Sequence, residues 1–305
     1  MNLQAVELLA ETAAPFKTTG RPLVSFVIPV GREGEGLASA MQEFVGQYNN
    51  VRSPVGAEFI LATDIGDPST GAAMAALSKA GVCRAFFLST RIGKGGTIKN
   101  IVRFASGSII VMLDADVPVH PSDIYQAIQM ITDGRADLVV ARRVKRWDGP
   151  TRAFLSVAYN LLVRMFFRTG VADHQAGFKV AKAEVLRGSL SYIRTDGLGF
   201  DTELIVWAKR LKIRISNIEV EWRDSKYKIS SNIIPLKALL TMLADLVVLR
   251  ITTLKEGMDL VLRTVGSVFD EDGKYVGPEY ITMLNAGNQS IMGLLRKLYA
   301  TVAFR

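Results

Sequence analysis

Two aspartates, Asp114 and Asp116, stand two residues apart directly after an apolar segment, residues 108–113, that is predicted to be a buried strand. Open α/β sheets bind ligands at the carboxyl ends of their parallel strands, so both carboxylates are expected at such an edge. Paired carboxylates beside a substrate phosphate are a common way of holding Mg²⁺ or Mn²⁺. The sequence therefore predicts a divalent-metal site. The alternative is that Asp116 only caps the helix beginning at Pro121.

Two glycine-rich segments precede this strand, and neither has the spacing of a nucleotide-binding fingerprint. Residues 30–36 follow a predicted strand but read G-x-x-G-x-G, whereas the dinucleotide fingerprint is G-x-G-x-x-G. Lys94 lies among the glycines of residues 93–96, but the position five residues before Gly93, where a P-loop requires a glycine, is Leu88. We interpret both segments as turns that allow the backbone to come close to a nucleotide.

Basic residues are concentrated between Asp137 and Asp173, where Asp148 is the single acid. The basic residues are Arg142, Arg143, Lys145, Arg146, Arg152, Arg164 and Arg168. Guanidinium groups suit a phosphate because they bind it bidentately, and the first members follow a predicted strand at its ligand end. For Arg164 and Arg168 a solvated helix face is an equal alternative.

The hydrophobic pattern predicts an α/β fold that positions these residues on a mostly parallel sheet. Strand-like and helix-like segments alternate, which is typical of right-handed crossovers. The predicted strands are residues 23–30, 58–62, 84–88, 108–113, 137–142 and 177–181, and the predicted helices are 34–48, 69–80, 95–106, 121–132, 151–169 and 200–210. Residues 213–222 alternate between apolar and polar and are predicted to be an antiparallel or edge strand. Residues 1–20 are predicted to form a helix followed by a polar arm.

Composition restricts the class of protein. The chain has 305 residues, of which 49% are hydrophobic, so one large domain with an appendage is expected. A single cysteine, Cys83, excludes a disulfide framework and a cysteine-based zinc site. The first residues lack a signal-peptide pattern, which predicts a cytoplasmic protein. The net charge of +8 favours an anionic partner, but no aromatic–basic interleaving supports nucleic acid.

The segment from Asn232 to about Lys255 has leucines at helical spacing and few charges. It is too interrupted to span a bilayer. It is predicted to be an amphipathic helix lying in a membrane interface, and packing against the domain or against a second subunit in a homo-oligomer is the alternative. The predicted organisation is an N-terminal arm (1–21), a catalytic domain (22–230) and C-terminal amphipathic helices with a tail (231–305).

The order of these motifs resembles family-2 glycosyltransferases of the nucleotide-sugar-binding GT-A fold. The series runs through Val27-Ile-Pro-Val30, Asp64, Gly93-Lys94-Gly95, Leu113-Asp-Ala-Asp116, Arg142-Arg143, Tyr159-Asn-Leu-Leu, Asp173-His-Gln-Ala-Gly-Phe-Lys179, Gly199-Phe-Asp-Thr-Glu203 and Trp222-Arg-Asp-Ser-Lys226. It is similar to polyprenyl- (dolichyl-) phosphate hexose synthases over about residues 22–230.

The resemblance implies roles for the matching residues. The donor site would comprise Pro29, Val30, Glu33, Asp64, Lys94 and Asp114, with Asp64 contacting the nucleotide base. The metal, Mg²⁺ or Mn²⁺, would be held by Asp114 and Asp116, and Asp116 and Asp173 would be the catalytic residues. The acceptor phosphate would be bound by Arg142, Arg143, Lys145 and Arg152. The loop containing Arg223, Lys226 and Lys228 would close over the diphosphate, the alternative being a basic exposed linker.

Several positions depart from the family pattern or leave a role open. Residues 63–66 replace the usual Asp-Asp-Gly-Ser, which leaves base recognition by Asp64 open to the alternative of a turn residue. Pro118 stands where relatives often have a further glutamine ligand. Asp173 would be a general base or would orient the acceptor, and His174 is a candidate third metal ligand.

The resemblance thus implies an inverting, metal-dependent transfer of a hexose from a nucleoside-diphosphate sugar to a polyprenyl phosphate at the cytosolic face of a membrane. The main alternative is a family-2 enzyme with a soluble or polysaccharide acceptor. A sugar nucleotidyltransferase is a further alternative, but it would need a catalytic basic residue in a glycine-rich loop after the first strand, which residues 31–36 fit poorly.

Overall fold

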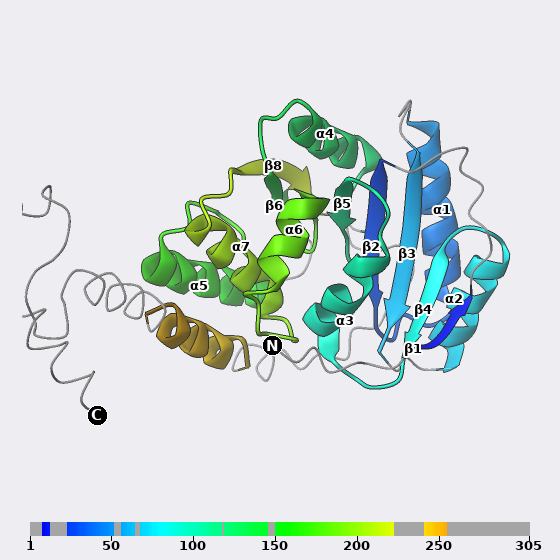
Figure 1. Cartoon of the computed structure of the whole chain (residues 1–305), viewed down its shortest axis with the longest axis horizontal. Helices are drawn as coiled ribbons and strands as arrows, with labels where there is room; N and C mark the ends of the chain where they lie inside the picture. Colours follow the sequence, from blue (N-terminus) through cyan, green and yellow to red (C-terminus); the bar gives the residue numbers. More distant parts are fainter. Residues whose placement is uncertain are drawn as a thin grey trace, which may run out of the picture. The chain divides into compact units, whose positions relative to one another are not determined.

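The computed structural model describes residues 8–12, 23–51, 56–64, 68–117, 119–145, 150–222 and 241–254 (Figure 1). The chain divides into two compact units, Met1–Leu246 and Val247–Arg305. All strands and all labelled helices belong to the first unit. The predicted tail, 257–305, lies outside the described residues.

The first unit is built on a mixed sheet, which has eight strands in the described part of the chain and the order β1-β4-β3-β2-β5-β7-β6-β8 (Figure 1). The strands are β1 (Leu8–Thr12), β2 (Val24–Val30), β3 (Ala57–Thr63), β4 (Arg84–Leu88), β5 (Ile109–Met112), β6 (Leu138–Lys145), β7 (Lys179–Lys182) and β8 (Ile215–Glu221). The β4-β3-β2-β5 run and the β6–β8 pair are parallel. The pairings β1–β4, β5–β7 and β7–β6 are antiparallel.

The predicted α/β fold is confirmed, with three differences in detail. β7 runs antiparallel between β5 and β6, so the sheet is mixed at this point. β8 is an edge strand as predicted, but it pairs parallel to β6. The helix predicted for residues 1–20 is wrong for Leu8–Thr12, which is a strand pairing with β4. Pairing with β4 satisfies backbone groups that the edge of the sheet would otherwise expose, and helical periodicity cannot reveal that gain.

The helices occupy both faces of the sheet. They are α1 (Gly36–Asn50), α2 (Pro68–Lys79), α3 (Gly93–Ile101), α4 (Pro121–Thr132), α5 (Pro150–Phe167), α6 (Ala183–Leu190) and α7 (Phe200–Arg210), with a 3₁₀ turn η1 (Val102–Phe104) after α3. All of them except α6 were predicted within a few residues. α6 is only eight residues long, which is too short for a clear helical period in the sequence.

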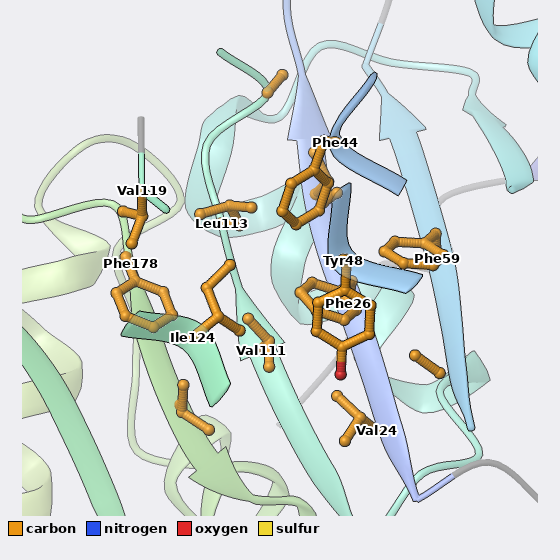
Figure 2. Packing of buried hydrophobic residues seen from close by; sticks show 14 of the residues in the cluster. Val24, Phe26, Phe44, Tyr48, Phe59, Val111, Leu113, Val119, Ile124 and Phe178 are labelled. Carbon is orange, nitrogen blue, oxygen red and sulfur yellow. The ribbon is translucent and has the colours of Figure 1, made fainter. Parts of the chain in front are cut away.

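Alternation along the strands separates two hydrophobic clusters. On one face, α1, α2 and α4 pack against inward residues such as Phe26 and Phe59. The aromatic group at its centre is compact, because the Phe26 ring stacks on Phe59 with centroids 4.7 Å apart and meets Tyr48 edge-on at 4.9 Å. Figure 2 shows this group beside a second one formed around Phe178. These contacts hold β2, β3 and β5 in a fixed arrangement.

On the opposite face, α3, α6 and α7 cover the alternate strand residues, among them Val27, Ile60 and Met112. α3 contributes Ile98 and Ile101 to this cluster. α3 and α7 also contact each other. The amino-terminal turns of both helices are thereby held against the same part of the sheet. This arrangement brings Lys94 of α3 within reach of Asp201 of α7.

Residues 241–254 are helical, so the predicted C-terminal helix is present in that part, while 223–240 lie outside the described residues. Within the first unit, Leu246 packs with Tyr159 and Val163 of α5 in a small third cluster. In the stretches that the structure describes, no helix combines the length and the hydropathy needed to cross a membrane.

Candidate active site

The predicted site residues converge on one edge of the sheet. Asp64 follows β3, and Asp114 and Asp116 follow β5, which lies on the other side of β2. Arg143 lies near the end of β6, and the 173–178 loop leads into antiparallel β7. Because parallel strands end at the same edge and an antiparallel strand begins there, all these segments meet. The topology therefore brings together the residues predicted from separate motifs.

A tight turn follows β5 and sets the direction of the two aspartates. The Val117 N–H donates to the carbonyl of Asp114 at 3.0 Å, so the chain reverses immediately after Asp116. Val117 has φ of 47°, a left-handed conformation that a β-branched residue rarely adopts. Strain of this kind is characteristic of functional sites, where the surroundings hold the chain in place.

Asp114 is held from two sides. Its Oδ1 lies 2.8 Å from the Lys94 ammonium, and its carboxylate lies against Gly177. A Cβ atom added to Gly177 would fall 1.7 Å from Oδ2 of Asp114. The glycine of the 173–179 motif therefore makes room for the carboxylate of Asp114.

Lys94 connects Asp114 to a buried ion pair. Its Nζ lies 2.8 Å from Oδ2 of Asp201, and Oδ1 of Asp201 lies 2.6 Å from Nζ of Lys179. Burial alone would lower the pKa of Lys94, but the charges of Asp114 and Asp201 outweigh it and hold that pKa above its ordinary value. Burial would likewise raise the pKa of Asp201, but the two lysines hold it below its usual range. Lys94 therefore bears a positive charge at the site.

Glu33 adds a third carboxylate to this region. Burial is the main cause that raises its pKa to about 7; two backbone hydrogen bonds oppose the rise, and the negative charges of Asp116 and Asp114 add to it. Its Oε2 atom is buried and has no hydrogen-bond partner in the described part of the chain. Three acids thus lie close enough to influence one another at the carboxyl edge.

The chemistry of these donors fits a divalent cation such as Mg²⁺ or Mn²⁺. Asp114 and Asp116 offer hard carboxylate oxygens, and neither nitrogen nor sulfur ligands are needed for such an ion. The described residues contain no cluster of three or more His, Cys, Asp or Glu side chains suited to a metal. Mg²⁺ is often held by one or two carboxylates plus substrate phosphates, so two aspartates are sufficient on the protein side.

Asp64 holds the start of α3. Its Oδ2 accepts hydrogen bonds from the backbone N–H groups of Ile92, at 2.9 Å, and Gly93, at 2.5 Å. Gly93 has φ of +77°, and a Cβ there would lie 2.8 Å from the carbonyl oxygen of Asp196. Asp64 and Gly93 therefore place Lys94 in the first turn of α3. Contact of Asp64 with a nucleotide base stays a prediction, as does the lining of that pocket by Pro29 and Val30.

Arg143 and Asp173 form a largely buried salt bridge. The guanidinium donates from Nε to Oδ2 of Asp173 at 2.6 Å and from Nη2 to Oδ1 at 2.9 Å. Both side chains are 9% exposed, and the guanidinium also stacks on the Trp222 ring at 5.1 Å. The predicted acceptor-binding cation and the predicted catalytic carboxylate thus lie in direct contact. Arg142, in contrast, is exposed and pairs with Glu219.

His174 is a core residue of the 173–178 loop. Its Nδ1 lies 2.9 Å from Oδ1 of Asn160, and its Nε2 lies 2.7 Å from the Thr169 hydroxyl. Burial lowers the pKa of His174 to about 4, so the ring is neutral at physiological pH. Because both ring nitrogens have partners, the alternative in which His174 is a third metal ligand is wrong for this structure.

Residues 201–203 make contacts beside the site that the sequence analysis did not predict. Besides Asp201, Thr202 receives Nε2–H of Gln175 at 2.7 Å, which ties the 173–178 loop to α7. Glu203 accepts the backbone N–H groups of Arg194 and Thr195. The available signal was the presence of two acids in the first turn of an otherwise apolar helix, which is unusual for buried positions.

Some predicted residues are not placed. The side chains of Lys145 and Arg152, and all of Arg223, Lys226 and Lys228, lie outside the described residues. Arg164 and Arg168 are exposed, as the solvated-face alternative predicted.

The sequence model of glycosyl transferase family 2 matches residues 25–190, which is more than half of the chain. Among curated proteins, glycosyltransferase AglD of Haloferax volcanii is 27% identical over 65% of this chain, and this chain spans only 33% of AglD. A dolichyl-phosphate beta-glucosyltransferase of Trichomonas vaginalis is 25% identical over 72% of this chain and 71% of its own length. The mouse dolichyl-phosphate beta-glucosyltransferase is 27% identical over 52% of both chains.

Among solved structures, glucosyl-3-phosphoglycerate synthase of Mycobacterium tuberculosis, crystallised with Mn²⁺, UDP and glucosyl-3-phosphoglycerate, has a TM-score of 0.59. The match covers 75% of this chain and 80% of the synthase at 20% identity, which is a likeness of fold. Together with the family match over the strands and turns that carry the aspartates, this likeness shows that the chain belongs to glycosyl transferase family 2 and is a glycosyltransferase of GT-A fold.

Proposed function

We propose that this glycosyltransferase moves a hexose from a nucleoside-diphosphate sugar to a polyprenyl phosphate, with inversion, while bound to the cytosolic face of a membrane. The observation that carries the proposal is the meeting of two groups at one sheet edge. Acidic Asp114 and Asp116 follow β5, and basic Arg142 and Arg143 lie at the end of β6. The first pair suits a metal-bound diphosphate and the second suits an acceptor phosphate.

On the donor side, Asp114 and Asp116 would hold Mg²⁺ or Mn²⁺. Such an ion, when bound, would neutralise the charge of the leaving nucleoside diphosphate. Lys94 is the charged side chain placed beside Asp114 and would donate to the diphosphate. Asp64 contributes to this site indirectly. It accepts hydrogen bonds from the backbone at the start of α3 and so fixes the first helical turn, which contains Lys94.

On the acceptor side, the phosphate oxygen would attack the anomeric carbon from the face opposite the departing diphosphate, which gives inversion. A phosphate monoester is already largely ionised near neutral pH, so its oxygen needs no general base. Asp173 would then serve as an orienting group, because its two oxygens fix the guanidinium of Arg143 in one plane. An arriving phosphate would meet a guanidinium that is already positioned.

A membrane location is supported by an apolar stripe on α5. Val157, Leu161 and Met165 are spaced four residues apart, and each is more than half exposed. The exposed Arg164 and Arg168 lie in and just beyond the last turn of the same helix, where they would meet anionic headgroups. In the second unit, Val247, Val248, Ile251 and Leu254 are also more than half exposed. Interfacial helices combine such apolar faces with basic residues.

The acceptor assignment is tested by radiolabelled transfer from UDP- and GDP-sugars to a short-chain, detergent-soluble polyprenyl phosphate. Arg143→Lys keeps the charge but loses the planar guanidinium that Asp173 orients, so the KM for this acceptor should rise about tenfold, the equivalent of one charged hydrogen bond. The KM for the donor should stay within about twofold. Arg135→Ala is the matched control, because Arg135 precedes β6 and lies at the opposite edge of the sheet.

Two outcomes would contradict this assignment. Transfer to soluble sugar or phosphoglycerate acceptors with no transfer to the polyprenyl phosphate would favour the alternative family-2 activity. Equal increases in both KM values for Arg143→Lys would place Arg143 at the donor diphosphate.

The membrane contact is tested separately with Leu161→Asp. Burying a leucine side chain in the interface contributes roughly 2 kcal/mol, so the charged variant should bind anionic vesicles at least about tenfold more weakly in flotation. Its transfer to the short soluble acceptor should be unchanged. Leu211→Asp, in the turn after α7 and 39% exposed, provides the same substitution outside the stripe. If both variants float like the wild type, the stripe on α5 does not face the bilayer.

A further inference from the structure

We infer that Lys94 is an exchangeable counter-ion that leaves Asp114 for the donor diphosphate, so that donor binding and metal binding strengthen each other. This inference rests on the proposed function, because it concerns the same donor and metal. Lys94 alone would couple the binding of the metal ion to the binding of the donor diphosphate at this edge of the sheet. In the structure, the ammonium of Lys94 lies 2.8 Å from Oδ1 of Asp114 and neutralises it.

Lys94 competes with a metal ion for the carboxylate of Asp114. Oδ1 of Asp114 faces an ammonium at 2.8 Å, and Oδ2 lies against Gly177. A divalent cation approaching this carboxylate meets a positive charge that already occupies one of its oxygens. Like charges at such distances repel by several times the thermal energy unless water separates them. Metal binding without nucleotide is therefore opposed by Lys94.

Movement of Lys94 does not leave Asp201 without a counter-ion. Asp201 would lose a partner if Lys94 moved, but Lys179 stays within 2.6 Å of its other oxygen. Lys179 is fully enclosed, with a side chain 0% exposed, and it also donates to the carbonyl of Ala176. A buried carboxylate without any counter-ion would be costly, and Lys179 removes that cost. Lys179 and Asp201 are thus positioning residues that leave Lys94 free to exchange.

Of the two lysines that contact Asp201, Lys94 is the one able to move. Lys94 is 19% exposed and lies in the first turn of α3, at the rim of the site. An ammonium on a four-carbon stem has three donors and can redirect them without moving the helix. A diphosphate supplies the negative charge that Lys94 gives up when Asp114 turns to a metal. Every charge has a partner both when Lys94 contacts Asp114 and when it contacts the diphosphate. Because binding of either ligand favours the second arrangement, the metal and the nucleotide strengthen each other's binding.

The experiment measures binding and requires no turnover. Mn²⁺ affinity is followed by the electron paramagnetic resonance signal of the free ion, and UDP or GDP affinity by calorimetry in the presence of chelator. Lys94→Met should bind Mn²⁺ alone about tenfold more tightly than the wild type, because the competing charge is gone, and should bind the nucleotide alone about tenfold more weakly. Lys99→Met removes a lysine from the same helix and should leave both affinities within about twofold.

Opposite changes in the two affinities are specific to exchange. A lysine that only preorganises Asp114 would make Mn²⁺ binding weaker when it is replaced, and that result, or unchanged Mn²⁺ binding, overturns the inference. Lys94→Arg retains the charge and should resemble the wild type for Mn²⁺ alone, which keeps the test decisive if Lys94→Met does not fold. Wild-type protein that binds nucleotide but never Mn²⁺ would instead contradict the metal assignment in the proposed function.

Discussion

Replacing Asp116 by asparagine is expected to lower kcat by more than about a hundredfold while the fold is retained. The carboxylate lies in the turn after β5 and belongs to none of the three hydrophobic clusters, so its charge contributes little to packing. The substitution removes one of the two carboxylates that would hold the metal. Loss of even an outer-shell partner of a metal typically costs ten- to a hundredfold in affinity or activity, and a direct ligand should cost at least as much.

The measurement combines steady-state kinetics with Mn²⁺ titration and thermal unfolding. Wild-type activity should disappear in chelator and return when Mg²⁺ or Mn²⁺ is added. Asp133→Asn is the matched control, because this aspartate pairs with Arg135 on the exposed surface and should leave all three readouts unchanged. Full activity of Asp116→Asn, or of the wild type in chelator, would show that the metal assignment is wrong.

Most of the scaffold of this site was predictable from sequence, because hydrophobic runs and their alternation are local signals. The strand before Asp114 and the helix starting at Pro121 follow directly from residues 108–132. The reversed direction of β7 was not predictable in the same way. Strand direction depends on which neighbours a strand pairs with, and β7 pairs with β5 and β6 across long sequence separations.

The side chains of the site were predictable only where they lie close together in the sequence and form one motif. The pair Asp114 and Asp116 came from a single turn. The link from Lys94 to Asp201 spans more than a hundred residues and depends on α3 and α7 lying on the same face. The pairing of Arg143 with Asp173 was also hidden, because each had been assigned a role of its own. Both ion pairs join residues that are far apart in the sequence, and only packing could reveal them.

Replacing Gly177, the glycine of the 173–179 motif, is expected to impair catalysis strongly. Gly177→Ala should lower kcat/KM by more than about a hundredfold, because the new methyl group occupies the position of the Asp114 carboxylate. The distances from an ideal Cβ are 1.7 Å to Oδ2, 2.2 Å to Cγ and 2.6 Å to Oδ1, so Asp114 must rotate away. That rotation would break its contact with Lys94 and remove it from the position next to Asp116. Overpacking of this kind also destabilises by roughly 1–3 kcal/mol.

The control separates loss of the carboxylate from a general effect of alanine. Gly177 does not have a left-handed φ, so alanine is compatible with its backbone and the clash is confined to Asp114. Gly188→Ala, in α6, meets no atom within 4 Å and should keep full activity with slightly higher stability, since alanine favours helix interiors. Kinetics, Mn²⁺ titration and thermal unfolding of both variants decide the question. If Gly177→Ala folds and remains fully active, the position of Asp114 seen here is not the one that supports transfer.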